Sequence, residues 1–209
     1  MGTNCAVFIA NMFCFTYEYD FISRLIAAQR VDILSHFIYT LRFVDDLLSC
    51  NNPVFEKYLY TNISDEDGIH GIYPPFLRVN CEQVSVSQVS FLDVLLYKAG
   101  RVFATKIYDK REHPPLSLID QTKYPHPSCF LSERSQYGIV TSRLHCFGRI
   151  CHKKVDFVQR SKKFIRDFLN RGYSKRKVSA FIKRFLKQVP LEFSVERLGS
   201  FTKALFESS

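Results

Sequence analysis

The stretch that decides the fold is Phe37-Ile38-Tyr39-Thr40-Leu41-Arg42-Phe43-Val44-Asp45-Asp46-Leu47-Leu48-Ser49. Its first arm, residues 37–43, is rich in aromatic and β-branched residues, which favour strands. The two aspartates follow where a tight turn would lead into a second apolar strand. Asn51-Asn52-Pro53 then ends the unit as a further turn. The pattern therefore predicts a β-hairpin with Asp45 and Asp46 at its tip.

An amphipathic helix is predicted before this hairpin, over residues 5–26. Apolar residues recur there at spacings of three and four, which places them on one helix face. Thr3 or Asn4 is suited to cap its first turn. The sequence thus begins almost at a helix N-cap, which is typical of the truncated end of a longer domain. We expect the hairpin to pack on this helix, whose apolar face is formed by Cys5, Phe8, Met12, Phe15, Tyr19, Ile22 and Ile26.

The rest of the chain changes from strands to helices. Residues 54–62 read as a short helix, and 77–81, 89–97 and 102–108 as strands, with 98–101 as the turn between the last two. A loop rich in Pro and Ser covers 112–134. Helices are predicted at 136–151, 154–171 and 174–188. The fold class is therefore α+β, divided into residues 1–111, a connection over 112–134, and a helical region over 135–209.

Charge is concentrated in the last third. Residues 142–187 contain 15 Lys and Arg against two Asp, a net charge of +13, while the remainder carries 14 basic and 18 acidic residues, a net charge of −4. The two sum to the net charge of +9 of the whole chain. A basic segment of this kind favours a polyanionic partner, with nucleic acid favoured over a membrane. The alternative is a solvated basic helix surface without a partner.

The cysteines indicate a reducing environment. Seven are present, an odd number at irregular spacing, several of them inside apolar runs. This favours an intracellular protein of the nucleus or cytoplasm. The apolar stretch 5–17 is too short to span a bilayer, so no membrane partner is expected. Cys146, Cys151 and His152 form a possible zinc cluster without a clear fourth ligand, and buried structural cysteines are the preferred interpretation.

Asp45 and Asp46 are the strongest candidates for chemistry. Nucleotidyl transfer uses two divalent cations about 3.5–4 Å apart, and carboxylates must hold them. A tight turn between two apolar strands projects acidic side chains from a rigid base, which meets that need. Ordinary polar turn residues would give the same pattern, so this alternative stays open.

Four separated segments resemble reverse transcriptases. Phe43-Val44-Asp45-Asp46, preceded by Arg42, resembles the aromatic-x-Asp-Asp box of that family. The opening Met1-Gly2-Thr3-Asn4-Cys5-Ala6, with Asn11-Met12-Phe13 and Tyr17-Glu18, resembles the glycine-led helix that precedes the box. Phe91-Leu92-Asp93 and Thr105-Lys106-Ile107-Tyr108-Asp109-Lys110-Arg111 are similar to later segments. The residues of these segments are most similar to those of Penelope-like retroelements, with non-LTR elements as the alternative.

The resemblance implies a partial palm followed by a basic helical thumb, acting on an RNA template, a DNA primer and dNTPs. It implies that Asp45 binds a catalytic Mg²⁺ or Mn²⁺ with Asp46 as an auxiliary ligand. Gly2, Thr3, Asn4 and Phe43 would line the template and nucleotide site, and Lys106 and Lys110 would lie near the primer. The residues expected to grip duplex phosphates are Arg160, Lys162, Lys163, Arg166, Lys175, Arg176 and Lys177.

The chain departs from the family at one serious point. The family's earlier motif supplies another metal-binding Asp, and only Met1 precedes Gly2 here. We therefore expect catalysis by this chain alone to be incomplete. The alternatives are a non-catalytic nucleic-acid-binding relic, or a helical interaction domain without nucleic acid. Gly71-Ile72-Tyr73 is similar to half of a GIY-YIG nuclease motif but reads as coincidence, and Asp93 is expected to be structural, paired with Lys106 or Arg111.

Overall fold

The computed structural model describes residues 5–118, 124–188 and 205–206 and divides the chain into two compact units, Met1–Val84 and Ser85–Ser209. Each unit is described here by itself. Helices and small antiparallel sheets occur together, which confirms the α+β class. The predicted partial palm, residues 1–111, extends over both units and stays a prediction. Among the described residues no helix is both long enough and apolar enough to cross a bilayer.

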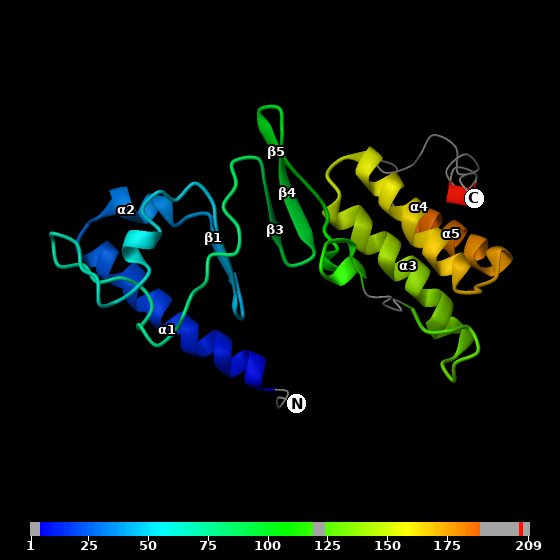
Figure 1. Cartoon of the computed structure of the whole chain (residues 1–209), viewed down its shortest axis with the longest axis horizontal. Helices are drawn as coiled ribbons and strands as arrows, with labels where there is room; N and C mark the ends of the chain where they lie inside the picture. The colour runs from blue at the N-terminus through cyan, green and yellow to red at the C-terminus, as the bar shows by residue number, and fades with distance from the viewer. Residues whose placement is uncertain (1–4, 119–123, 189–204, 207–209) are drawn as a thin grey trace. The chain divides into compact units, whose positions relative to one another are not determined.

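The first unit is built on one long helix. It contains α1 (Ala6–Ala27), α2 (Val31–His36), the hairpin strands β1 (Thr40–Phe43) and β2 (Asp46–Ser49), and the 3₁₀ turn η1 (Glu56–Tyr58), coloured blue to cyan in Figure 1. The predicted short helix over 54–62 is therefore only this 3₁₀ turn. The core of the unit joins α1 to the later loops through Phe21, Leu25, Ile33, Phe37, Tyr58, Ile69, Ile72 and Tyr73.

The helix predicted at 5–26 is confirmed, but a different face of it is buried. Six residues of the predicted apolar face are exposed within this structure, namely Cys5, Phe8, Met12, Phe15, Tyr19 and Ile26, and only Ile22 packs against the core. Phe21 and Leu25 are buried instead, with Cys14 and Tyr17 packed beside them. These four recur at helical spacing as well, so α1 carries two apolar stripes. Spacing could not tell which of the two the small core would cover.

The predicted hairpin is confirmed. β1 and β2 are antiparallel, and their register pairs Phe43 with Asp46, which leaves Val44 and Asp45 as the two turn residues. Val44 has a φ of +56°. The first position of such a two-residue turn requires this left-handed conformation, which glycine usually supplies. A β-branched residue there is strained.

Gly71 allows a loop to lie directly against the backbone of η1. A Cβ at this position would lie 2.4 Å from the Tyr60 carbonyl oxygen, so only glycine fits. The close approach lets Ile72 N–H donate to the Tyr58 carbonyl and Tyr73 N–H to the Leu59 carbonyl, both at 2.8 Å. The Gly-Ile-Tyr segment therefore has a structural explanation, in agreement with its interpretation as a coincidental motif.

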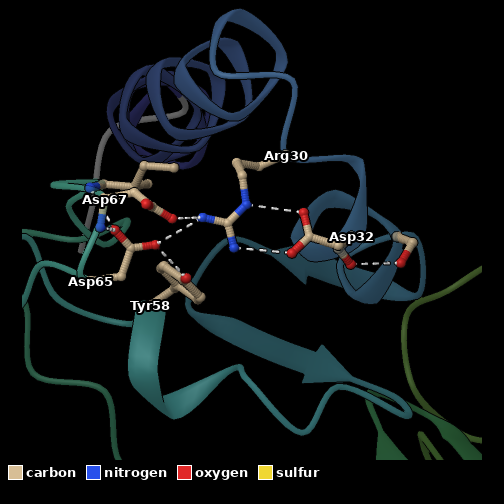
Figure 2. Close-up of polar contacts among 7 residues, drawn as sticks. Arg30, Asp32, Tyr58, Asp65 and Asp67 are labelled. Carbon is tan, nitrogen blue, oxygen red and sulfur yellow. Dashed lines mark hydrogen bonds and ion pairs between the residues drawn. The ribbon is translucent and has the colours of Figure 1, made fainter.

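A buried carboxylate organises the next loop (Figure 2). Asp65 has a side chain only 3% exposed. Its oxygens accept hydrogen bonds from the Tyr58 hydroxyl at 2.7 Å and from the backbone N–H groups of Asp67 and Ile69 at 3.1 and 2.8 Å. The Arg30 guanidinium lies 3.7 Å from it and also pairs with Asp32 and Asp67. Arg30 thereby offsets part of the negative charge of the loop where it packs on the core.

The second unit begins with a three-stranded antiparallel sheet, ordered β3 (Gln88–Phe91), β4 (Val94–Ala99) and β5 (Val102–Ile107). The strand predicted at 102–108 and the turn before it are confirmed, with Gly100 at a φ of +69°. Two other strand predictions are wrong. Residues 77–81 form no strand, and 89–97 is interrupted by a hairpin turn at Leu92 and Asp93. The apolar run on both sides of that turn hid it from the pattern.

Helices complete the second unit, as predicted. After the 3₁₀ turns η2 (Lys110–Glu112) and η3 (Leu116–Leu118) come α3 (Glu133–Ile150), α4 (Lys154–Asn170) and α5 (Lys175–Gln188). α3 packs against both α4 and α5, drawn green to orange in Figure 1. α5 turns one apolar face to the core of the bundle, where Val178, Ile182 and Phe185 are buried.

Candidate functional site

The aspartate hairpin is the candidate metal-binding site. Asp45 is the second turn residue and is exposed, while Asp46 is the first residue of β2 and is half-buried. The hairpin connects to α1, as predicted: the Val44 N–H donates to the Asn11 side-chain oxygen at 3.3 Å. The turn that carries Asp45 is thus held from the helix side.

Arg42 makes the main side-chain contacts between the hairpin and α1. We call Arg42, together with its partners Glu18 and Asn11, the Arg42 latch. Its Nε and Nη2 donate to the two carboxylate oxygens of Glu18 at 2.5 and 3.1 Å, a bidentate pair. Its Nη1 donates to Asn11 Oδ1 at 2.7 Å and to the Val44 carbonyl at 3.1 Å. The guanidinium, only 12% exposed, therefore holds both the helix and the strained turn. The hydrogen bond to Glu18 raises the pKa of Arg42, so the latch stays charged.

Glu18 extends the latch into the core. The Tyr73 hydroxyl donates to Glu18 Oε1 at 2.6 Å. Burial of this tyrosine, together with the hydrogen bond to the carboxylate, raises the pKa of its hydroxyl. Asp45 and Asp46 consequently sit on a turn that is fixed through Arg42 and Glu18 to the buried Gly-Ile-Tyr segment. Such a rigid base is what a metal-binding carboxylate needs.

The donor set fits Mg²⁺ in kind but not in number. Carboxylate oxygens are the ligands that Mg²⁺ and Mn²⁺ prefer. Among the residues that the structure describes, however, no group of three or more His, Cys, Asp or Glu side chains lies close enough together to hold a metal ion. Asp45 and Asp46 are therefore two ligands of a site that needs more, and no catalytic step follows from them alone. The same finding applies to Cys146, Cys151 and His152; Cys151 belongs to the core of the bundle.

Comparison with known proteins places the chain in no family. No protein-family model matches the chain, and neither a curated protein nor a solved structure matches it.

The other residues predicted to line a palm are distributed over the two units. Gly2, Thr3 and Asn4 lie outside the described residues. Phe43 ends β1 opposite Asp46 and is exposed. Lys106 lies on β5 in the second unit, with its ammonium 5.0 Å from the ring centre of Tyr97, and Lys110 opens η2 and is exposed.

Most of the predicted phosphate-binding residues are exposed on the helical unit. Arg166, Lys175 and Arg176 are exposed, and Lys162 is half-buried. Lys163 and Lys177 are exposed too, although each has a carboxylate partner: Lys163 lies 3.0 Å from Glu112 and Lys177 2.6 Å from Glu133. The basic surface of α4 and α5 therefore exists as predicted from the charge pattern.

Arg160 differs from the others, because it serves the fold. Its guanidinium, 18% exposed, donates to Asp109 at 2.8 Å and pairs with Glu112 as well. These contacts attach the η2 turn to α4. Arg160 is therefore less exposed than predicted, because two carboxylates that lie far away in the sequence pair with it. Its role in phosphate binding stays a prediction.

The expected partners of Asp93 are also occupied elsewhere. Arg111 pairs with Asp109 at 2.8 Å, and Lys106 lies over Tyr97. Asp93 is the second residue of the β3–β4 turn, exposed, and its carbonyl accepts a hydrogen bond from Tyr108 N–H at 2.8 Å. Its place matches that of Asp45 in the first hairpin, since Leu92 before it has a φ of +53°.

Two groups of residues were not recognised in the sequence as parts of a site. The roles of Arg42, Glu18 and Asn11 as a latch depend on contacts across more than twenty residues. The one sequence feature that could have indicated this role is Arg42 itself, an arginine inside an otherwise apolar strand. The second group is the loop before α3, which exposes Phe130 completely; a Pro- and Ser-rich sequence gave no sign of its fixed shape.

Proposed function

We propose that this chain is a piece of a retroelement-type reverse-transcriptase core, in which the first unit contributes part of the palm and the helical unit binds nucleic-acid phosphates. One observation carries the proposal: Asp45 stands on a strained two-residue turn, directly before Asp46, and the Arg42 latch holds this turn in place. Backbone strain of this kind persists where surrounding contacts enforce it, and it is concentrated at functional sites.

The role proposed for Asp45 and Asp46 is to bind the divalent cations of nucleotidyl transfer. When bound, these cations would activate a 3′-hydroxyl and neutralise a triphosphate. Two carboxylates do not complete such a site. We therefore expect Mn²⁺ to bind weakly, with a dissociation constant in roughly the millimolar range, as for a pair of exposed carboxylates. We also expect that the purified chain does not extend a primer.

Electron paramagnetic resonance of Mn²⁺ tests the metal site. The spectrum of free Mn²⁺ should decrease on adding the chain, and should recover with Asp45→Asn and Asp46→Asn combined. Asp93→Asn, which changes the matching turn of the second unit, is the control and should leave binding unchanged. Equal binding by all the variants would contradict the assignment. Primer extension that Asp45→Ala abolishes would show instead that the chain is catalytically complete.

The second part of the proposal is phosphate binding by the basic helices. Each duplex phosphate that a Lys or Arg neutralises releases condensed counterions, so affinity should fall with salt with a log–log slope of about −0.9 per phosphate. Fluorescence anisotropy with an RNA–DNA hybrid measures this slope. Reversing charge at Lys162, Lys163 and Lys175 should weaken binding to all sequences alike. Arg101→Glu, in the exposed β4–β5 turn, is the matched control.

A non-catalytic nucleic-acid-binding relic is the second candidate. The observation that favours it is the lack of a third metal-binding side chain beside Asp45 and Asp46 among the described residues. A relic would bind the hybrid with the same salt dependence but would bind no Mn²⁺ through Asp45 and Asp46. The two measurements together therefore separate the candidates, and salt-independent or absent hybrid binding would overturn both.

A further inference from the structure

One end of the helical unit combines a completely exposed aromatic ring with basic residues. The Phe130 loop, residues 124–132, leads into α3, and the relative exposure of Phe130 is 111%. Leu131 beside it is exposed as well. An aromatic side chain on a surface is unremarkable if its loop is loose. Here hydrogen bonds fix the shape of the loop, so the exposure of Phe130 follows from the fold.

A single buried amide forces Phe130 outward. Gln136 on α3 is only 4% exposed, and its Nε2 donates to the Cys129 carbonyl at 3.2 Å and the Leu131 carbonyl at 2.9 Å. These are the carbonyl groups on either side of Phe130. Holding both from the inside leaves the side chain between them directed away from the unit. Ser132 then caps α3 by accepting from the Ser135 N–H at 3.2 Å.

The loop is attached to the junction of α4 and α5. The Tyr173 hydroxyl donates to the Pro125 carbonyl at 3.0 Å, and Pro127 lies beside Gly172. In the same region the Ser174 N–H donates to the Tyr137 hydroxyl at 3.1 Å. In Figure 1 the start of α3 and the α4–α5 turn lie at the same end of the bundle.

Exposed cations surround this attachment. Arg171 ends α4, and Lys175 and Arg176 open α5, on either side of the residues that bind the loop. Lys177 pairs with Glu133, the first residue of α3. The same end of the helical unit therefore presents an aromatic ring and several positive charges, a combination that suits bases and phosphates together.

We infer that the Phe130 loop and the α4–α5 junction form a binding site for single-stranded nucleic acid, in which an unpaired base stacks on Phe130 and adjacent phosphates contact Arg171 and Arg176. The inference rests on the proposed nucleic-acid function and adds a substrate class to it. It adds an aromatic ring to the basic surface, because Phe130 lies outside the basic segment 142–187 in sequence but near its α4–α5 junction in space.

Single strands fit this site better than duplexes or membranes. The faces of bases inside a duplex are covered by their neighbours, so a ring projecting from a loop can stack only on an unpaired or terminal base. A membrane anchor would need a wider apolar surface. Besides Phe130 and Leu131, the exposed residues of the loop are His126, Ser128 and Ser132, which are polar.

Substitution of Phe130 tests the inference in the full chain. Fluorescence anisotropy with a single-stranded oligonucleotide, once as DNA and once as RNA, should show affinity weakened about 5-fold to about 150-fold by Phe130→Ala. Binding to a long blunt hybrid, in which only the two terminal base pairs expose a face, should change little. Phe103→Ala, which removes a ring that is 66% exposed on β5, is the matched control and should bind both ligands as the wild type does.

A tryptophan probe gives a direct readout, because the chain contains no Trp. Phe130→Trp should keep the affinity, and its fluorescence should be quenched by single strands, whereas Phe103→Trp should not respond. Equal single-strand affinity of Phe130→Ala and wild type, with hybrid binding intact, would overturn the inference and leave the proposed function standing. Quenching by anionic phosphatidylserine vesicles, but not by oligonucleotides, would overturn it in favour of a membrane surface. If the wild-type chain does not bind the hybrid, the proposed function is refuted.

Discussion

Single side chains hold the hairpin and the loops of the first unit in place. Gly71 permits the approach of the Gly-Ile-Tyr segment to η1, Asp65 accepts three hydrogen bonds in a loop, and Arg42 connects the hairpin to α1. Each of these residues can be substituted without changing the hydrophobic pattern of the sequence. Each substitution therefore tests one contact of the folded unit.

Gly71→Ala should destabilise the first unit by roughly 1–3 kcal/mol, the usual cost of overpacking. The added methyl group would lie 2.4 Å from a backbone oxygen, which has little freedom to move. Urea unfolding measures the change. Gly138→Ala is the control: its Cβ meets no atom within 4 Å, and α3 should gain rather than lose stability. An unchanged midpoint for Gly71→Ala would mean that the two segments are not in contact.

The stability of the first unit should fall in acid because of Asp65. Burial pushes the pKa of this carboxyl upward, but the bonds from Tyr58, Ile69 and Asp67 more than offset it, so the pKa lies below its ordinary value of 3.8. A lowered folded-state pKa stabilises the protein above the ordinary pKa, and the effect is lost as pH falls through the folded value. Urea midpoints measured from about pH 5 to about pH 2 should therefore decrease.

Asp65→Asn should reduce stability at neutral pH and flatten this acid dependence. Asp20→Asn is the matched control, since Asp20 forms an exposed ion pair with Arg24 and surface pairs contribute little. An acid dependence that is as steep in Asp65→Asn as in the wild type would assign it to other carboxyl groups. The Tyr58 hydroxyl, whose pKa burial and the bond to Asp65 raise to about 12, stays protonated throughout this range.

At the scale of elements, the hairpins share one turn geometry. Val44, Leu92 and Gly100 each occupy the first position of a two-residue turn, with φ values of +56°, +53° and +69°. Only the last is glycine. The first two hairpins therefore carry strain immediately before an aspartate, at Asp45 and Asp93, and this strain is measurable.

Val44→Gly and Leu92→Gly should each stabilise the chain by about 1 kcal/mol, because glycine adopts a positive φ without steric cost. Val102→Gly, in the extended β5 strand, should instead destabilise it by a similar amount. Thermal unfolding followed by circular dichroism distinguishes the two directions. A loss of stability in Val44→Gly would show that the valine side chain contributes packing that exceeds the strain.

At the scale of the whole molecule, the chain consists of two compact units with an exposed connection. Residues 81–88 around the boundary are all exposed, and residues 78–85 form no helix or strand. The two cores share no residue, since one is centred on α1 and the other on α3. Each unit should therefore keep its own structure when the connection is cut.

Limited proteolysis with a glutamate-specific protease should cleave after Glu82 and release two folded fragments. Glu82→Gln should remove this cut and no other, which makes it the control. Circular dichroism of the separated fragments should add up to the spectrum of the intact chain. Unfolding of either fragment on cleavage would show that the unit depends on the other for its stability.

The sequence by itself determined the elements with a strong local signal: α1, the aspartate hairpin, the Gly100 turn, the last three helices and the basic character of α4 and α5. Periodicity and turn chemistry act over a few residues, so they can be read directly. The predictions from sequence were wrong where two patterns coincide. The two cases are the choice between the two apolar stripes of α1 and the apolar run that a turn interrupts at Leu92.

Only the tertiary structure decided which residues are available for function. Arg160 is taken up by Asp109 and Glu112, Arg42 is committed to Glu18 and Asn11, and Phe130 is directed outward by Gln136. All these partners are brought together by packing and not by spacing along the chain. Local pattern shows where a charge or ring lies in the sequence, whereas its exposure depends on contacts that only the folded chain creates.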